Sequence, residues 1–401
     1  MTDSVARPTA IPAESAVPQE PTKARVLTVD IIRGFALFGI LFINVTTFRS
    51  NNPGWTGLDR IADTLSLILG QGKFLTTFMI MFGVSFTFQS RNIDTRHFLP
   101  QYLRRIGMLL VFGLLHFVLV WEGDILLQYV VPGLLLLFFA RRGARTVLIW
   151  TCVLWGLWLV MLVVIVGVTT FQHTHQGTAS SGALFSPTLY GTASYGDLVL
   201  SRFRALPGML EEHGISSVFL LSTFLLGVYI GKSGFLTNPE QHALLLRRVF
   251  VLGLPLGLAM NAISSWGTPV MYSMPVPIAM LIIASAVIGL PTLSLAYIAG
   301  LALLVQHAPW LKPLAAVGRM SLTNYLMQSV ILTTAFYGYG LGWYNKVGPV
   351  LGIALITVVF ALQIPVSVWW MRRFRYGPIE WIWRSVTYWR VQTLRAPVSS
   401  Q

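Results

Sequence analysis

Long apolar runs dominate the chain and set its class. Nine of them lie near residues 31–48, 68–89, 103–121, 125–140, 146–171, 215–231, 248–265, 318–336 and 347–370. Each is about long enough to cross a hydrocarbon core of roughly 30 Å as a tilted helix. A further apolar region, residues 269–306, is interrupted by four prolines and can hold one span or two. The pattern predicts an all-α, polytopic helical membrane protein with about ten transmembrane helices.

Basic residues predict the orientation of these spans. If the N-terminus is cytoplasmic, 21 of the 28 Lys and Arg residues fall in cytoplasmic segments and six in external ones. Positive charge accumulates on the cytoplasmic side of membrane proteins. This distribution requires residues 269–306 to cross an odd number of times. We therefore expect ten spans, both termini in the cytoplasm, and a re-entrant or interfacial piece within 269–306.

Composition supports the membrane class and argues against a nucleic-acid ligand. Charged residues make up 10% of the chain, whereas an ordinary soluble domain carries about 25%. The net charge of +14 is spread over short connections between apolar runs, so it reflects topology. We expect a multi-pass protein of the inner cell membrane that binds no nucleic acid, and its oligomeric state stays open.

Three segments have distinct compositions. Residues 1–24 are rich in Pro, Ala, Ser and Thr, which predicts a disordered cytoplasmic tail. Residues 25–376 form the multi-span domain, in which the polar stretch 172–214 is the largest external loop. Residues 377–401 begin with Gly-Pro and carry tryptophans beside arginines, which predicts a C-terminal interfacial helix and tail. Within that helix, Glu380 and Arg384 are four residues apart and can pair.

The first span keeps a polar stripe. Asp30, Arg33 and Asn44 share one helix face, because eleven residues make roughly three full turns. Charges at membrane depth are costly and mark functional sites by default. Asp30 and Arg33 can form a local ion pair that assists insertion, or they can line a site for a polar ligand from the cytoplasm. Asn44 fits the second interpretation, although a lone asparagine can also join two helices.

The third span and the short connection after it carry candidate acid–base residues. His116 lies within the span, and Glu122 and Asp124 follow at its outer end. Histidine titrates near neutral pH and serves as a proton shuttle or general base. A neutral histidine bonded to a neighbouring helix is the structural alternative. Asp124 can cap the next helix, or one of the two acids can orient His116.

The segment GRMSLTNYLMQSVILTT is the most polar span. Ser321, Asn324, Tyr325 and Gln328 line one face of it, which indicates a polar cavity or a helix–helix contact rather than lipid. Arg319, at its inner end, can snorkel to the surface or bind a phosphate. No clustered metal ligands, Walker motif or G-x-S-x-G elbow is present, so we expect no metal site.

The chain resembles the YeiB-like family of bacterial membrane proteins along nearly its whole length after residue 25. The matching motifs are DIIRGFALFGILFINV, GQGKFLTTFMIMFG, LLHFVLVWEGDILLQY, GRMSLTNYLMQS and RYGPIEWIWRSVT. The family looks like a branch of the transmembrane acyltransferase superfamily that includes the lysosomal heparan-α-glucosaminide N-acetyltransferase. Those enzymes move an acyl group from cytoplasmic acyl-CoA to an acceptor across the membrane. Their catalytic histidine precedes a Trp-x-Gly-Leu stretch; here NNPGWTGLDRIAD matches at Trp55, Gly57 and Leu58 but contains no histidine.

The resemblance implies an acyl-CoA-dependent O- or N-acyltransferase with no tightly bound cofactor and an envelope glycan or lipid as acceptor. Arg33, Arg319 and Arg104 or Arg105 would hold CoA phosphates, and His116 would be the base, with Asp124 or Glu122 beside it. Asp30 and Asn44 would line a polar tunnel between the two faces. The alternatives are a transporter for a small polar solute, with His116 and Asp124 as a proton relay, or a membrane scaffold or sensor.

Overall fold

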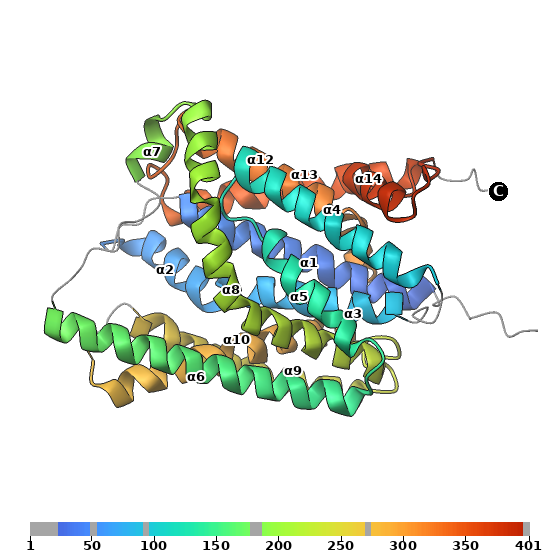
Figure 1. The fold of residues 1–401 in the computed structure, drawn as a ribbon, viewed down its shortest axis with the longest axis horizontal. Helices are drawn as coiled ribbons and strands as arrows, with labels where there is room; N and C mark the ends of the chain where they lie inside the picture. Colours follow the sequence, from blue (N-terminus) through green and yellow to red (C-terminus); the bar gives the residue numbers. More distant parts are fainter. Residues whose placement is uncertain (1–22, 49–53, 91–95, 177–186, 269–273, 396–401) are drawn as a thin grey trace, which may run out of the picture.

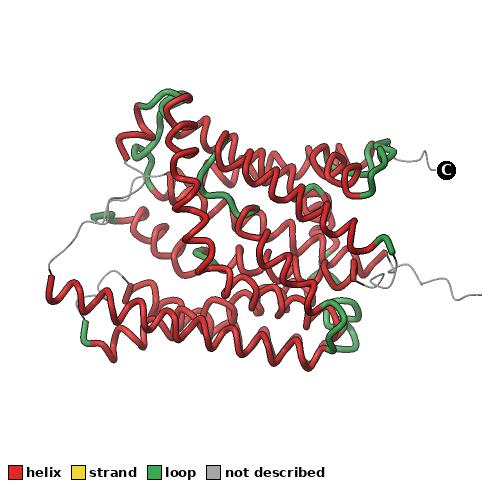
Figure 2. The backbone as a smooth tube through the Cα atoms, in the orientation of Figure 1, coloured by secondary structure: helices red, strands yellow, loops and turns green. Residues whose placement is uncertain are grey.

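The computed structural model describes residues 23–48, 54–90, 96–176, 187–268 and 274–395. The predicted disordered tail thus lies almost entirely outside the described residues. Within them the chain is helical and has no β-strand (Figure 2). In Figure 1, α6, α9 and α10 form the lower layer, α1, α3 and α5 the middle, and α4, α12 and α13 the upper.

Eight helical segments among the described residues are long and apolar enough to cross a membrane. They comprise α1 (Lys23–Phe48), α2 (Gly57–Leu65) continued by η1 (Ser66–Gly70) and α3 (Lys73–Gln89), α4 (Phe98–Leu119), α6 (Ala144–Gln176), α8 (Tyr195–Ser233), α9 (Ala243–Gly267), α10 (Val276–Leu304) and α13 (Pro349–Arg373). The predicted all-α, multi-pass membrane architecture is confirmed.

Shorter helices complete the bundle and close its ends. They are η3 (Leu127–Tyr129), α5 (Val130–Leu135), η4 (Leu136–Phe139), α7 (Pro187–Thr192), η6 (Pro309–Leu311), α11 (Lys312–Arg319), α12 (Ser321–Phe336) and α14 (Pro378–Thr387). The stretch 127–139 and α12 run beside the long helices (Figure 1). Counting these two with the eight gives the ten predicted spans, and that number stays a prediction, as does the cytoplasmic location of both termini.

The proline-rich region 269–306 differs from the prediction. Its described part forms one continuous helix, α10, without a re-entrant piece. Pro275 and Pro277 lie at the start of the helix, where the backbone N–H that proline lacks would have no acceptor within the helix. Pro291 lies inside the helix, which continues past it. Pro275 and Pro277 therefore mark the start of a span, and Pro291 does not divide it.

The predicted external loop 172–214 is also mostly helical where it is described. α6 continues to Gln176, α7 follows, and α8 starts at Tyr195. Ser194 and Asp197 form a capping box that fixes this start, because each side chain bonds the other residue's backbone N–H. α8 then runs through Pro207 into the membrane-spanning segment, so a polar sequence here encodes a helical extension.

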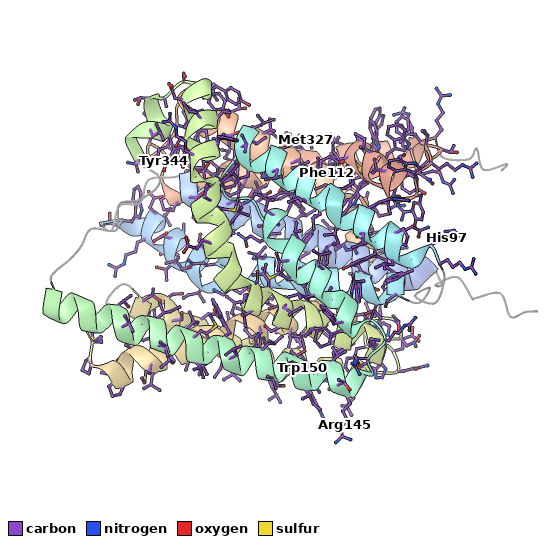
Figure 3. All side chains as sticks on the ribbon, viewed as in Figure 1. His97, Phe112, Arg145, Trp150, Met327 and Tyr344 are labelled. Carbon is purple, nitrogen blue, oxygen red and sulfur yellow. The ribbon has the colours of Figure 1, made fainter. Side chains whose placement is uncertain are left out.

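One end of the bundle gathers the elements that build the candidate site. His97 and Arg145 project at this end, where α14 also lies, and Tyr344 lies at the opposite end (Figures 1 and 3). The backbones of α1 and α11 touch here. A Cβ on Gly318 would lie 1.9 Å from the Asp30 carbonyl oxygen, and one on Gly34 would lie 2.2 Å from the Leu314 carbonyl oxygen. Glycine at both positions therefore brings the two helices together.

Candidate functional site

A cavity of about 600 Å³ lies between α1, α3, α4, α12 and α14. Its wall contains two carboxylates, Asp30 and Glu380, and five arginines, Arg33, Arg105, Arg319, Arg375 and Arg384. Aromatic side chains, among them Phe82, Tyr129 and Trp383, form much of the rest. The cavity therefore combines an excess of positive charge with broad apolar surfaces, which suits an anion that carries an apolar or planar part.

The polar stripe of α1 reaches this cavity only in part. Arg33 Nη1 lies 3.3 Å from Asp30 Oδ1, and Arg33 Nη2 also donates to the Ser85 hydroxyl. Asp30 is buried, whereas the Arg33 side chain keeps a quarter of its surface exposed. The pair is therefore a local ion pair in a cavity wall, and the ligand site expected there stays a prediction. Asn44 is half-buried further along α1 and does not line the cavity.

The C-terminal helix α14 closes one side of the cavity. Glu380 accepts hydrogen bonds from the backbone N–H groups of Leu322 and Thr323, at 2.7 and 3.0 Å, and from the Thr323 hydroxyl. The two N–H groups lie in the first turn of α12, where they have no acceptor within the helix. Burial raises the pKa of the Glu380 carboxyl, and the hydrogen bonds from Thr323 partly oppose this.

The predicted Glu380–Arg384 pair is therefore replaced. Glu380 points to α12 because a negative charge satisfies that helix N-terminus. The Arg384 guanidinium instead lies 4.7 Å from the ring centre of Tyr376.

The two neighbouring arginines of α4 have different surroundings. The Arg105 guanidinium lies 4.9 Å from the Trp383 ring centre, and Trp383 Nε1 donates to the Arg105 carbonyl oxygen at 3.0 Å. Arg105 lines the cavity. Arg104 lies 5.2 Å from the ring centre of Trp389 and is absent from the lining. Of the two arginines predicted to hold CoA phosphates, Arg105 lines the cavity and Arg104 does not.

His116 and Asp124 form a buried pair. His116 Nδ1 lies 2.6 Å from Asp124 Oδ2, and their side chains are 1% and 0% exposed. Asp124 Oδ1 accepts from the Leu127 backbone N–H at 2.7 Å, so this residue also caps η3. With both oxygens of Asp124 acting as acceptors, the Nδ1–H tautomer leaves the lone pair on Nε2. Nε2 is buried and has no hydrogen-bond partner among the described residues.

Tyr325 joins this pair to the cavity. Its ring centre lies 5.1 Å from that of His116, and the side chain also lines the cavity. The hydroxyl accepts from the Ile125 N–H at 3.3 Å and donates to the Gly123 carbonyl oxygen at 3.4 Å. His116 itself is not a lining residue.

The predicted polar face of α12 divides between two partners. Ser321 and Tyr325 line the cavity. Asn324 and Gln328 instead contact α13: Asn324 Nδ2 donates to the Ser367 hydroxyl at 3.1 Å, and Gln328 Nε2 donates to Gln363 Oε1 at 2.8 Å. Both interpretations of this face, cavity lining and helix–helix contact, thus apply to different residues of it.

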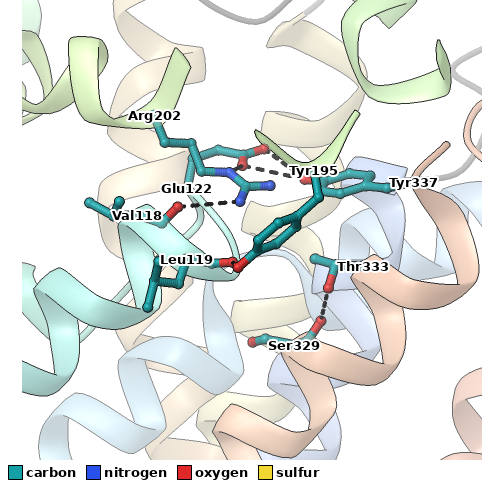
Figure 4. A network of polar contacts seen from close by, with 8 residues as sticks. All are labelled: Val118, Leu119, Glu122, Tyr195, Arg202, Ser329, Thr333 and Tyr337. Carbon is teal, nitrogen blue, oxygen red and sulfur yellow. Dashed lines mark hydrogen bonds and ion pairs between the residues drawn. The ribbon is translucent and has the colours of Figure 1, made fainter. Parts of the chain in front are cut away.

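Glu122 contacts residues that the sequence did not indicate (Figure 4). Arg202 Nε donates to Glu122 Oε2 at 3.1 Å, and the Tyr337 hydroxyl donates to Glu122 Oε1 at 3.0 Å. Arg202, from α8, is almost fully buried. Glu122 therefore pairs with Arg202 and Tyr337 and not with His116. The available signal was an acid, Glu122, directly after an apolar run and an arginine, Arg202, at a polar stretch with no assigned partner.

Comparison with known proteins identifies relatives over nearly the full length. The chain is 32% identical to the "Uncharacterized protein YxaH" of Bacillus subtilis over 92% of this chain and 95% of that protein. It is 28% identical to the "Uncharacterized protein YeiB" of Escherichia coli over 90% of this chain and 96% of that protein. Residues 230–390 match the family model "Protein of unknown function (DUF418)". This chain belongs to the YeiB-like DUF418 family. No solved structure matches it significantly.

The matched DUF418 segment contains one half of the site. It includes Arg319, Tyr325, Glu380 and Arg384 from the cavity wall. The His116–Asp124 pair, Asp30 and Arg33 lie N-terminal to it. The cavity is therefore assembled from the DUF418 segment and the preceding helices, so neither part alone forms it.

Proposed function

We propose that this protein is a transmembrane acyltransferase that takes an acyl group from acyl-CoA bound at the arginine-lined cavity. The observation that carries the proposal is the His116–Asp124 pair, whose Nε2 is unpartnered, one aromatic ring away from a cationic cavity. The acceptor would be an envelope glycan or lipid, and the protein would lie in the inner cell membrane, where cytoplasmic acyl-CoA is accessible.

The cavity charge supports binding of a phosphate-bearing co-substrate. Five guanidinium groups face two carboxylates, and both carboxylates already accept hydrogen bonds from the protein. Arginine binds phosphate through parallel N–H donors, which makes it a specific as well as a charged ligand. The aromatic walls can contact a planar base or an acyl chain.

The proposed chemistry is a direct transfer. His116 Nε2 accepts the proton of an acceptor hydroxyl or amine while the acceptor oxygen or nitrogen attacks the thioester carbonyl carbon. The C–S bond then breaks, and the departing CoA thiolate receives the proton from the imidazolium. Asp124 holds the Nδ1–H and stabilises the imidazolium while it exists. An acyl-histidine intermediate on Nε2 remains an alternative route.

Binding of a non-hydrolysable acyl-CoA analogue to the purified full chain tests the first step. Arg33→Ala and Arg319→Ala should each weaken binding more than tenfold, because a hydrogen bond to a charged group contributes about 1.5–3 kcal/mol. Arg319→Ala is the clearer test, since Arg33 forms an ion pair with Asp30 that its removal would break. Arg104→Ala is the matched control and should bind as the wild type does, because Arg104 lies outside the lining.

The transfer step has its own test. His116→Ala should abolish acyl transfer and leave analogue binding intact, because the arginines belong to the cavity wall and His116 does not. Equal analogue affinity in the wild type and both cavity variants would contradict the proposal. If the wild type then carried a small anion into proteoliposomes with a pH dependence that His116→Ala removes, the transporter alternative would replace it.

A further inference from the structure

The cavity and the His116–Asp124 pair are adjacent but separate. The deep wall of the cavity contains Ile125, Leu126, Tyr129 and Tyr325. His116 is 2% exposed and does not belong to that wall. Tyr325 belongs to that wall, and its ring contacts the imidazole. In this arrangement a ligand in the cavity cannot reach His116 Nε2, which the proposed reaction requires.

Tyr325 is held in place by weak contacts at its tip. Its hydroxyl makes two hydrogen bonds, to Ile125 N and Gly123 O, at 3.3 and 3.4 Å. Both distances are long for bonds made by a hydroxyl group. The two backbone partners flank Asp124 in the connection between α4 and η3, so the ring is fastened to the segment that orients His116.

Tyr325 contacts both the His116 ring and the cavity. One side of Tyr325 contacts the His116 ring, and the other borders a cavity of about 600 Å³. A side chain enclosed in a close-packed core cannot rotate without displacing its neighbours. Tyr325 is itself 2% exposed and belongs to the main hydrophobic core, so rotation of its ring breaks the two hydroxyl contacts and displaces neighbouring core side chains toward the cavity.

We infer that Tyr325 is a gate that separates the cavity from His116 and opens by rotation of its ring. The purpose of this gate rests on the proposed function, since its opening would allow a thioester in the cavity to reach Nε2. It excludes water and cytoplasmic solutes from the His116–Asp124 pair while no ligand is in place. Tyr325 is in this view a positioning residue, and its rotation breaks no covalent bond.

Chemical modification of His116 tests the gate without any acyl-CoA. Diethyl pyrocarbonate acylates accessible imidazole nitrogens, and peptide mass spectrometry reports each histidine of the detergent-solubilised full chain separately. His97 is exposed and provides the internal reference rate. In the wild type, His116 should react at least a hundredfold more slowly than His97. Tyr325→Phe, which keeps the ring and loses the two hydroxyl contacts, should increase the His116 rate about fivefold.

Two further variants complete the design. Tyr325→Ala should increase the His116 rate more than tenfold, because the ring itself is removed. Phe336→Ala is the matched control: Phe336 is a buried aromatic residue of the same helix, but it lies outside the cavity lining and its ring contacts Phe48 and Trp343. It should leave the His116 rate at the wild-type value.

Three results would overturn the gate: wild-type His116 reacting as fast as His97, Tyr325→Phe reacting at the wild-type rate, or Phe336→Ala accelerating the reaction as much as Tyr325→Ala. The last would mean general loosening of the bundle. A protein that fails to bind the acyl-CoA analogue yet shows the expected modification pattern would retain the gate and lose the proposed function.

Discussion

Separating His116 from Asp124 should destabilise the fold by an amount that the structure allows us to estimate. The pair is fully buried, with 2.6 Å between Nδ1 and Oδ2. Truncating His116 to alanine leaves the Asp124 carboxylate in an apolar interior with the Leu127 N–H as its remaining donor. Breaking a buried pair in this way costs about 3–5 kcal/mol. Asp124→Asn keeps an acceptor for Leu127 and removes the charge, so we expect a smaller loss of about 1–3 kcal/mol.

A double-mutant cycle isolates the interaction. The His116→Ala/Asp124→Asn protein no longer contains an unpaired buried carboxylate, so its loss should be less than the sum of the single losses by about 2 kcal/mol. Unfolding in detergent can be followed by the fluorescence of the 13 tryptophans. His97→Ala, an exposed histidine at the start of the same helix, is the control and should change stability by no more than about 0.5 kcal/mol.

Additivity would refute this account of the pair. If the two single losses summed to the double loss within about 0.5 kcal/mol, the two side chains would not interact energetically. The short distance would then reflect packing alone, and Asp124 would serve only as the cap of η3. The general-base role of His116 would lose the partner that sets its tautomer.

Two other predictions concern α14 and topology. Glu380→Ala should lower stability by about 2 kcal/mol through loss of its contacts to the N-terminus of α12, whereas Glu380→Gln, which keeps two acceptor contacts, should lose less than about 1 kcal/mol. Because burial raises the pKa of Glu380, the stability of the wild type relative to Glu380→Gln should fall as pH rises above 4.5 in thermal melts; the opposite slope would contradict that burial. In a Cys152-free background, an impermeant thiol reagent outside intact cells should label Ser180→Cys and not Arg390→Cys, and the reverse pattern would invert the orientation.

The helices could be predicted from sequence because each apolar run is sufficient to indicate a span. The two differences arose where a local signal has more than one structural meaning. Polar residues in 195–214 suggested a loop, yet a capping box and inward-facing residues such as Arg202 make that stretch helical. Prolines in 269–306 suggested a break, yet a helix start and a membrane helix interior accommodate proline.

Contacts within the site were predictable only at short sequence separation. Asp30 and Arg33 are three residues apart, and His116 and Asp124 are eight apart across one short connection. The bond between Glu122 and Tyr337 joins residues 215 apart, and that between Glu380 and Thr323 joins residues 57 apart. Such pairs depend on which helices are neighbours, which hydrophobic periodicity does not specify. The division of the α12 face between cavity and α13 has the same origin.

The connection between α1 and α2 contains no histidine, which restricts where the proposed acyl transfer could occur. The Trp-x-Gly-Leu match lies at the start of α2, where Leu58 is 73% exposed and the wall of the cavity contains no residue of α2. Among the histidines whose side chains the structure describes, His97 and His307 are exposed, His242 is half-buried, and only His116 is buried with a carboxylate partner.

A base at His116 would move the reaction from the outer connection into the bundle interior. The acceptor would then have to enter near Glu122 and Arg202 (Figure 4). Glu122 lies two residues before Asp124, and Arg202 of α8 donates to Glu122 and to the Val118 carbonyl oxygen. Acyl-CoA would arrive from the cavity on the other side of Tyr325. The two substrates can meet at Nε2 only if the inner gate opens, so the modification experiment on Tyr325 decides whether this geometry permits the reaction at all.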